Sequence, residues 1–233
     1  MFETENMNRF IHNHTKKFAV VDSVAKRINM LKGLYSAHGH KGYIGEPISQ
    51  IQHAAQAATL AKNTSHSDEV VCAAFLHDIG HMLVSRDFHL EKMVTNGIDY
   101  GVKNHERVGA IFAYEVTESL TISNLINNHV IAKRYMAGKY PHYHDTLSPA
   151  SRQTLKFQGG PLTKEEQVEL ERDPLFPIYI SMRRWDDKAK DPNLEIPQQE
   201  INGFWNMLQG VIERNTKKKW IRPGDTIPES WRM

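Results

Sequence analysis

The chain has 233 residues, of which 40% are hydrophobic and 24% are charged, and its formal net charge is +2 when the histidines are neutral. This length and apolar content allow a substantial core, and one domain overall is the interpretation we favour. The balanced charge, with lysines and arginines scattered along the chain, argues against a nucleic-acid partner. A single cysteine, Cys72, excludes an intramolecular disulfide and fits a reducing cytoplasm, where we expect the protein.

The first residues contain no apolar stretch, so we expect neither a signal peptide nor a membrane-spanning segment, and no membrane partner. We divide the chain into a helical N-terminal extension over residues 1–33, a catalytic core over 34–190, and a C-terminal part over 191–233. The last part consists of a helix and an extended tail from about residue 217, both packed on the core.

Apolar residues recur at helical spacing and strand-like alternation is nearly absent, which predicts an all-α bundle. The first helix should run from about residue 18 to residue 35 and end at the glycine-rich stretch 38–46. Pro47 can occupy the first turn of the next helix, which carries His53. A third helix should cover residues 69–77, capped near Ser67. The mixed polarity of residues 84–101 predicts a loop.

Asn104 can cap the next helix, and a further helix should cover about residues 121–135 and carry His129. Residues 138–149 are expected to cross the surface irregularly. Three more helix starts then follow from the sequence. Their signals are Ser148 as N-cap with Pro149 at the first position, Thr163 and Glu166 as a capping box, and Pro177 before the helix that holds Asp186.

The most informative motif is His77-Asp78-Ile79-Gly80-His81, because an adjacent histidine and aspartate can serve two metal ions. A carboxylate can bridge two metals, which would make Asp78 the bridge and leave His77 on one ion. Imidazole and carboxylate ligands suit iron, manganese or zinc, and the near absence of cysteine argues against a thiolate site. The further candidate ligands are His53, His105, His129 and Asp186. Six candidates exceed the need of one ion and predict a two-metal site.

Several residues have a simpler interpretation than a functional one. On spacing alone Asp187 is as good a ligand as Asp186. Residue type alone would put Lys133 and Arg183 on the solvated surface, and Cys72 in the core. The remaining histidines that we interpret as ordinary polar residues are His66, His89, His142 and His144.

Several longer strings carry a resemblance to a known family. They are Tyr43-Ile44-Gly45-Glu46, Gln52-His53, the His77-Asp78 motif, His129-Val130-Ile131-Ala132-Lys133-Arg134-Tyr135, Leu147-Ser148-Pro149-Ala150-Ser151 and Arg183-Arg184-Trp185-Asp186-Asp187. Together with the ligand series they resemble the HD-domain superfamily, a helical-bundle fold, in its mixed-valent di-iron oxygenases of the PhnZ/TmpB type. That resemblance covers about residues 34–190, and the strings around Tyr43 and Lys133 are its most specific part.

The resemblance implies two iron ions in the Fe(II)/Fe(III) state and cleavage of an organophosphonate C–P bond with O2. It assigns His53, His77, Asp78, His105, His129 and Asp186 to the metals. The expected substrate is (R)-2-amino-1-hydroxyethylphosphonate, which would yield glycine and phosphate, although the trimethylammonium analogue stays open. The substrate would bind one iron through its hydroxyl and a phosphonate oxygen, and the protein would be a monomer or homodimer.

Other residues receive roles toward the substrate from the same resemblance. Lys133, Ser151 and Arg183 would bind the phosphonate, although Ser148 remains an alternative to Ser151. Lys133 lies one helical turn after His129 and hence on the same face. The other assigned residues are Tyr43 and Glu46, as catalytic and substrate-binding residues in a loop over the iron, Gln52 in substrate binding, and His81 as a proton-handling residue.

Three other functions remain open from the sequence. An HD-type phosphohydrolase acting on a nucleotide or phosphate ester would use the same ligands with a metal-bound hydroxide, but would leave Tyr43 and Glu46 without a role. A non-catalytic binding module would have no need of six intact ligands. An oxygenase that cleaves C–C bonds, as inositol oxygenase does, shares the ligands but matches the strings around Ser151 and Arg183 less well.

Overall fold

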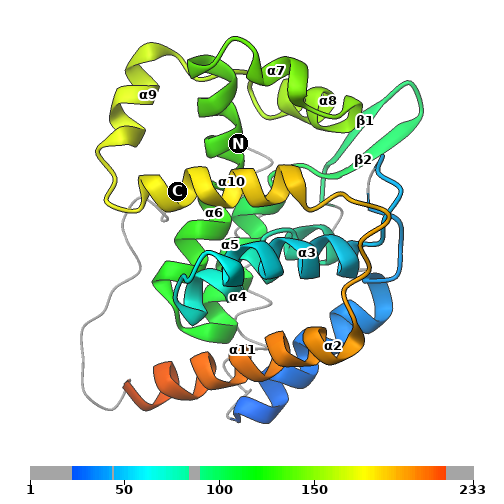
Figure 1. Ribbon diagram of the computed structural model, residues 1–233, viewed down its shortest axis with the longest axis vertical. Helices are drawn as coiled ribbons and strands as arrows, with labels where there is room; N and C mark the ends of the chain where they lie inside the picture. Colours follow the sequence, from blue (N-terminus) through cyan, green and yellow to red (C-terminus); the bar gives the residue numbers. More distant parts are fainter. Residues whose placement is uncertain (1–22, 44, 84–89, 219–233) are drawn as a thin grey trace.

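The computed structural model describes residues 23–43, 45–83 and 90–218, and these residues are helical apart from one two-stranded sheet and the connecting loops (Figure 1). The elements before the sheet are α2 (Val24–His38), α3 (Gln50–Asn63), α4 (Asp68–Leu76) and the short 3₁₀ helix η1 (Ile79–Met82). Those after it are α5 (His105–Thr117), α6 (Leu120–Lys139), α7 (Tyr143–Thr146), α8 (Pro149–Phe157), α9 (Lys164–Glu171), α10 (Phe176–Lys188) and α11 (Gln198–Lys218). The predicted all-α bundle is confirmed.

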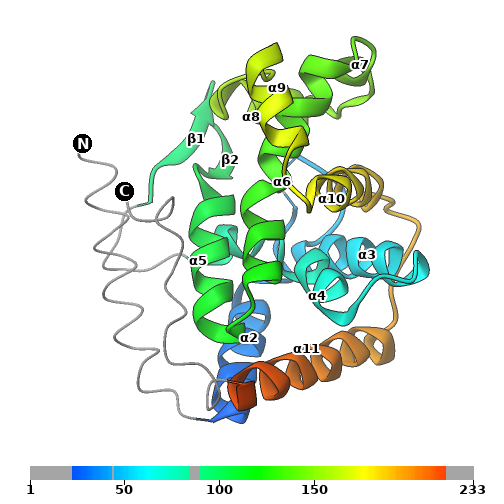
Figure 2. The same cartoon turned by 90° about the vertical axis from the view of Figure 1, so that its left-hand side faces the viewer.

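The helices α5 and α6 lie side by side, and α4 and α10 pack on α6 (Figure 2). α3 packs in turn on α4 and α10. α2 and α11 close one end of this bundle, and α7, α8 and α9 lie at the other end with the sheet. The bundle therefore has a central part, in which α3, α4, α5, α6 and α10 meet. Its two ends are formed by α2 and α11 on one side and by α7, α8, α9 and the sheet on the other.

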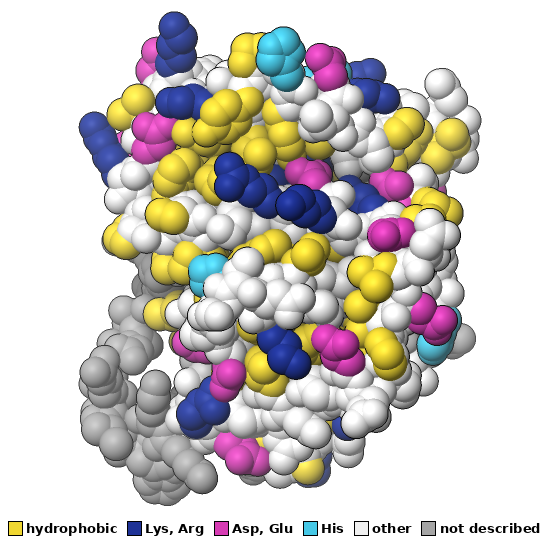
Figure 3. Space-filling model, in the orientation of Figure 1, with side chains coloured by type: hydrophobic (Ala, Val, Ile, Leu, Met, Phe, Trp, Pro, Cys, Tyr) yellow, Lys and Arg dark blue, Asp and Glu magenta, His cyan; other side chains and the backbone are white. Residues whose placement is uncertain are grey.

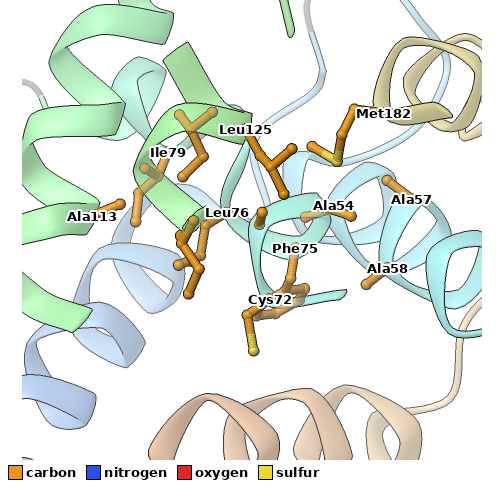
Figure 4. Packing of buried hydrophobic residues seen from close by; sticks show 14 of the residues in the cluster. Ala54, Ala57, Ala58, Cys72, Phe75, Leu76, Ile79, Ala113, Leu125 and Met182 are labelled. Carbon is orange, nitrogen blue, oxygen red and sulfur yellow. The ribbon is translucent and has the colours of Figure 1, made fainter. Parts of the chain in front are cut away.

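Small and branched apolar side chains fill the centre of the bundle. Figure 4 shows Ala54 of α3, Phe75 of α4 and Leu125 of α6 in one cluster of buried side chains. Phe75 stacks on Tyr35 of α2, with ring centroids 5.3 Å apart. Cys72 is buried in the same cluster, as expected of a core residue. The alanines of α3 let that helix approach its neighbours closely, because a methyl side chain adds little thickness to the contact. The close approach brings His53 of α3 toward the end of α4.

The caps expected from the sequence are confirmed at α8 and α9 and only partly elsewhere. The expectation for Pro47 is wrong, because α3 begins at Gln50 and its N-cap is Ser49. Ser67 and Asn104 do precede α4 and α5, but neither side chain makes a capping hydrogen bond. Ser148 accepts a hydrogen bond from the backbone N–H of Ser151, with Pro149 at the first position of α8. Thr163 and Glu166 form the capping box of α9 in both directions. These local contacts fix where α8 and α9 begin, and α8 presents its first turn to the cavity described below.

The loop predicted over residues 84–101 is partly wrong. β1 (Lys92–Thr95) and β2 (Ile98–Val102) form an antiparallel hairpin in which Thr95 pairs with Ile98. Asn96 and Gly97 make the two-residue turn, with φ of 49° and 76°. This Asn-Gly pair between β-branched residues is the usual hairpin signal, and the irregular charge pattern around it concealed it. Residues 84–89 of the predicted loop lie outside the described residues.

Three further expectations concern the connections and chain ends. The stretch predicted to be irregular over residues 138–149 contains α7, a single turn of helix. α2 begins at Val24 after the N-cap Ser23, and the proposed start near residue 18 lies outside the described residues, as does the tail from residue 219. The division of the chain at residues 33 and 190 stays a prediction, although α2 spans the first of these positions.

On the surface shown in Figure 3, acidic and basic side chains are interspersed and do not form a block of one sign. Within the described residues, no helix combines the length and apolarity needed to span a membrane.

Candidate metal centre

Six buried side chains meet where α3, α4, α5, α6 and α10 converge. His53 comes from α3, His105 is the first residue of α5, and His129 lies in the middle of α6. The other three are His77 and Asp78, at the end of α4, and Asp186 of α10. They form two groups that could each hold a metal ion: His53, His77 and Asp186, and Asp78, His105 and His129.

Asp78 lies between the two groups and turns one oxygen toward each. Its Oδ2 is 3.5 Å from Nε2 of His53 and 3.4 Å from Nε2 of His77. Its Oδ1 is 3.4 Å from Nε2 of His105 and 3.5 Å from Nε2 of His129. This is the arrangement of a carboxylate that bridges two ions, one on each oxygen.

The ring orientation of the histidines fits metal binding. His53, His77 and His129 each direct Nδ1 at a backbone carbonyl, with N···O distances of 2.7, 2.8 and 2.6 Å. A neutral imidazole that donates through Nδ1 has its lone pair on Nε2. The Nε2 atoms of His53 and His77 are only 3.1 Å apart, as are those of His105 and His129. Facing lone pairs repel unless a cation lies between them, so these residues fit a metal.

The carboxylates support the same conclusion. Oδ2 of Asp78 and Oδ1 of Asp186 are buried and have no hydrogen-bond partner among the described residues. Burial opposes ionisation of Asp78, but its interactions with the surrounding imidazoles, first that of His77 and then those of His105 and His53, hold its pKa well below the usual range. Two ionised, unpartnered oxygens in a buried site are the donors that a divalent or trivalent cation requires.

The structure separates Asp186 from Asp187. Oδ1 of Asp186 is 3.4 Å from Nε2 of His53, whereas Asp187 accepts hydrogen bonds from Arg183 and from the hydroxyl of Tyr143. Arg183 also donates to Oδ2 of Asp186 at 2.7 Å. Asp186 is therefore the candidate ligand, and Asp187 fixes the arginine that orients it.

A cavity of about 40 Å³ opens on the side of Asp78, His105 and His129. This group offers three protein ligands, one fewer than the group of His53 and His77 with both aspartates, so coordination positions remain for other molecules. The polar residues lining the rest of the cavity are Tyr43, Glu46, His81, Tyr100, Lys133, Ser151, Thr154, Gln158 and Arg183.

The cation predicted on the face of His129 lies inside this cavity. Lys133 is 3% exposed and donates to Oγ1 of Thr154 at 2.9 Å. Burial, and next the charge of Arg183, lower the pKa of Lys133 to about 7. Nε of Arg183 is buried and has no partner among the described residues. Each terminal nitrogen of Arg183 already donates to a carboxylate, so Nε is the guanidinium nitrogen that the described residues leave available to a phosphonate oxygen.

Tyr43 covers the other histidine pair. Its ring stacks on His53 with centroids 3.8 Å apart, and burial followed by the charge of Asp78 raises the pKa of its phenol well above the ordinary value. His81 stacks on His105 at 3.9 Å and accepts a hydrogen bond at Nδ1 from the N–H of Val102, so its neutral form carries the proton on Nε2. Tyr43 and His81 thus each lie against a ligand from one of the two groups.

One expected substrate residue lies elsewhere. The amide of Gln52 is paired with the backbone N–H and carbonyl of Ile196, at 2.8 and 3.2 Å, and it does not line the cavity. Its neighbour His53 points in a different direction around α3, because adjacent helical residues are rotated by about 100°. Conversely, the sequence analysis missed Thr154 of α8 and Gln158, the C-cap of that helix, which both line the cavity. Thr154 follows Ser151 by three residues and Gln158 follows Thr154 by four, and this helical spacing was the available signal.

Comparisons with known proteins agree with this geometry. Residues 50–172 match the HD domain. The chain is 38% identical over 195 residues to hydroxymethylphosphonate dioxygenase of Gimesia maris, covering 82% of this chain and 90% of that protein. It is 31% identical over 191 residues to the glycine-betaine-forming 1-hydroxy-2-(trimethylamino)ethylphosphonate dioxygenase of Leisingera caerulea, covering 81% and 91%. An uncharacterized protein of Acanthamoeba polyphaga mimivirus is 37% identical over 170 residues, covering 73% and 75%.

The fold and the paired histidine and aspartate groups define a metal-dependent enzyme of the HD-domain family, and the chain belongs to that family. Within it, the chain is an oxygenase of the group that includes the two dioxygenases named above.

Proposed function

We propose that the protein uses O2 to cleave the C–P bond of a 1-hydroxyphosphonate. The proposed substrate is (R)-2-amino-1-hydroxyethylphosphonate, and the products are glycine and phosphate. Two iron ions in the Fe(II)/Fe(III) state are the proposed cofactors, bound by His53, His77, Asp78, His105, His129 and Asp186. The observation that carries the proposal is that the three-ligand group shares its cavity with Lys133 and Arg183, two cations suited to a phosphonate.

The protein side chains would bind and orient the substrate from the wall opposite the metal ligands. Lys133 and Ser151 donate to phosphonate oxygens, and Nε of Arg183 is a further unused donor. The positive end of the α8 dipole lies in the same region, because Ala150 and Ser151 of the first turn line the cavity. These contacts fix the phosphorus and direct the substrate hydroxyl toward the ligands His105 and His129.

Glu46 and the small cavity bear on the choice of substrate. Glu46 lines the cavity with a buried oxygen that has no hydrogen-bond partner among the described residues, and this favours a substrate with a cationic amine. The cavity is small, about 40 Å³, and this favours a primary amine over the bulkier trimethylammonium group.

The bound irons would supply Lewis acidity for the hydroxyl and phosphonate oxygens and would activate O2. The substrate supplies all four electrons, because C1 is oxidised to a carboxylate as its bond to phosphorus breaks, and no external reductant is needed. His81, with its proton on Nε2, is placed to hold or return a proton beside His105. The Tyr43 loop excludes water from the opposite side.

The test uses the iron-loaded protein with four compounds under O2: both enantiomers of 2-amino-1-hydroxyethylphosphonate, the trimethylammonium analogue and hydroxymethylphosphonate. Phosphate, O2 consumption and the carboxylic acid are measured together. The proposal expects phosphate and glycine from the R enantiomer, one O2 consumed per phosphate, and a mixed-valent EPR signal. Phosphate from another compound alone would replace the proposed substrate, and no phosphate from any of them would refute the reaction.

A second set of assays addresses the phosphohydrolase. The same protein loaded with Mn²⁺ or Mg²⁺ is tested on nucleotides and phosphate esters without O2, where we expect no turnover. Two variants then test the phosphonate contact: Ser151→Ala should raise KM about tenfold for loss of one hydrogen bond to a charged group, while Gln52→Ala should leave it unchanged. Equal effects of the two changes would contradict the assignment of Ser151.

A further inference from the structure

Lys190 connects three parts of the candidate site that are far apart in the sequence. It lies two residues beyond α10, and its Nζ donates to Oγ of Ser151 at 3.1 Å. The same atom is 4.0 Å from Oε1 of Glu46 and 6.0 Å from the centre of the Tyr43 ring. It is also 3.8 Å from Oδ1 of Asp186. One ammonium group therefore contacts the loop over the metals, the first turn of α8 and a metal-ligand carboxylate.

The loop that carries Tyr43 and Glu46 is a compact unit. The N–H of Tyr43 donates to the carbonyl of Ile48 at 2.7 Å, and the N–H of Glu46 donates to the carbonyl of Tyr43 at 2.9 Å. Gly42 and Ser49 form an isolated antiparallel bridge at its base. Because these bonds lie within the loop, they hold its shape but do not attach it to the rest of the molecule.

Few contacts attach the tip of this loop to the site. Gly45 has φ of +71°, and a Cβ at that position would lie 2.7 Å from Cβ of Ala150, so the tip rests directly on the start of α8. Oε1 of Glu46 is buried without a hydrogen bond, and among the described residues Lys190 is the cation that lies within 4.0 Å of it. A carboxylate largely shielded from water needs such a countercharge, so Lys190 is the main attachment of the Glu46 side chain.

We propose that Lys190 is a positioning residue that holds Tyr43 and Glu46 in place over the metal ligands by pairing with Glu46 while it is anchored on Ser151. Lys190 also links the loop to the residues that would bind the substrate. A ligand that hydrogen-bonds to the hydroxyl of Ser151 replaces the contact between Lys190 and Ser151. A substrate amine that pairs with Glu46 replaces the contact between Lys190 and Glu46. Lys190 thus makes release of the loop depend on occupation of the cavity. Only these last consequences rest on the proposed function.

The experiment measures how exposed the Tyr43 phenol is in the full-length, iron-loaded protein without substrate. N-acetylimidazole acetylates accessible tyrosines, and peptide mass spectrometry gives the rate at each position. Tyr140, which is 46% exposed, reports on the reagent, and Tyr179, which is 1% exposed, reports on the integrity of the core. Lys190→Met is compared with Lys188→Met, a change at an exposed lysine on the end of α10.

We expect Tyr43 to react about tenfold faster in Lys190→Met, because the cation that pairs with the largely buried carboxylate of Glu46 is lost. Tyr179 should stay protected, Lys188→Met should match the wild type, and Lys190→Arg should restore protection to within about threefold. Equal protection of Tyr43 in Lys190→Met and Lys188→Met would overturn the proposal. So would a parallel rise at Tyr179 with a lower Tm, because that result means general loosening.

A second variant decides the matter if Lys190→Met does not fold. Glu46→Gln removes the charge that Lys190 pairs with and keeps the size of the side chain, so Tyr43 should again react about tenfold faster. Protection of Tyr43 in Glu46→Gln at the wild-type level would overturn the proposal. Since no substrate is present, these outcomes are independent of whether the protein cleaves a phosphonate.

Discussion

Arg183 donates a hydrogen bond to Oδ2 of Asp186 and thereby leaves Oδ1 of that carboxylate facing Nε2 of His53, 3.4 Å away. The other terminal nitrogen of Arg183 is held by Asp187. The residue expected to bind only substrate therefore also orients a metal ligand. Groups that orient ligands in this way commonly change metal affinity by 10- to 100-fold when they are removed.

Arg183→Met should accordingly weaken the metal position formed by His53, His77 and Asp186. We expect metal content to fall from about two ions per chain toward one at limiting metal, because the group with His105 and His129 does not use Asp186. Elemental analysis after dialysis against a weak chelator measures this. Arg184→Met, at an exposed position on the same helix, is the matched control and should retain both ions. Retention of two ions in Arg183→Met would contradict the orienting role.

Asp78→Asn should affect both metal positions at once, because each oxygen of Asp78 faces a different histidine pair. A chelator should lower the Tm of the metal-loaded wild type by roughly 10 °C. A ligand present at about a thousand times its Kd raises the free energy of unfolding by about 4 kcal/mol, and the chelator removes this contribution. Asp78→Asn should show little change on chelation, and His105→Ala about half the wild-type change. Asp145→Asn, an exposed control, should behave as the wild type does. Calorimetry with and without the chelator distinguishes these outcomes.

Lys133 should make stability depend on pH. Its pKa is about 7 in the folded protein and near 10.5 in the unfolded chain, so between these values only the unfolded chain holds the proton. Stability therefore rises with pH over this window, and below pH 7 the folded protein carries the full cost of a buried charge. Lys133→Met should raise the Tm of the substrate-free protein by several degrees at pH 6 and by less at pH 9.

The same substitution should weaken phosphonate binding by about 10- to 100-fold, because a charge-assisted hydrogen bond is lost in a buried site. Titration of methylphosphonate by calorimetry measures this. Lys139→Met, at a more exposed lysine on the same helix, is the control and should show neither the pH-dependent gain nor the loss of affinity. A Tm gain at pH 6 that is no larger than at pH 9 would show that the ammonium of Lys133 is not held at a lowered pKa.

Gly80→Ala should disturb the second metal position through the backbone. A Cβ at Gly80 would lie 2.0 Å from the carbonyl oxygen of His105, so the start of α5 has to shift. We expect a loss of roughly 2–4 kcal/mol in the free energy of unfolding and loss of the ion bound by His105. Gly203→Ala on α11, where a Cβ meets nothing within 4 Å, should instead stabilise by about 0.5–1 kcal/mol. Chemical denaturation with metal analysis separates the two.

Gly80 shows that local sequence patterns can predict where a helix ends but not which distant residue a glycine contacts. The sequence predicts that the third helix ends at residue 77, close to the observed end of α4 at Leu76, and Gly80 lies in the short helix η1 that follows. Its closest contact, however, is with a residue 25 positions later in the chain. The hairpin of residues 92–102 is the reverse case, because its Asn96-Gly97 turn was a local signal that reading the whole stretch as a loop overlooked.

The sequence by itself determined the helical class, the caps of α8 and α9, and the residue types able to hold two metals, because these depend on periodicity, short-range hydrogen bonds and side-chain chemistry. Tertiary packing alone decided which way adjacent residues point. Asp186 rather than Asp187 meets His53 because of how α10 lies on α6 and α3, and Gln52 turns to Ile196 while His53 turns inward. Neighbours on a helix differ by about 100° in direction, and only the packed helices select the inward one. The position of Lys190 beside Glu46 and Ser151 follows from the same packing, since no local pattern relates a residue to one 39 positions away, as Ser151 is, or farther, as Glu46 is.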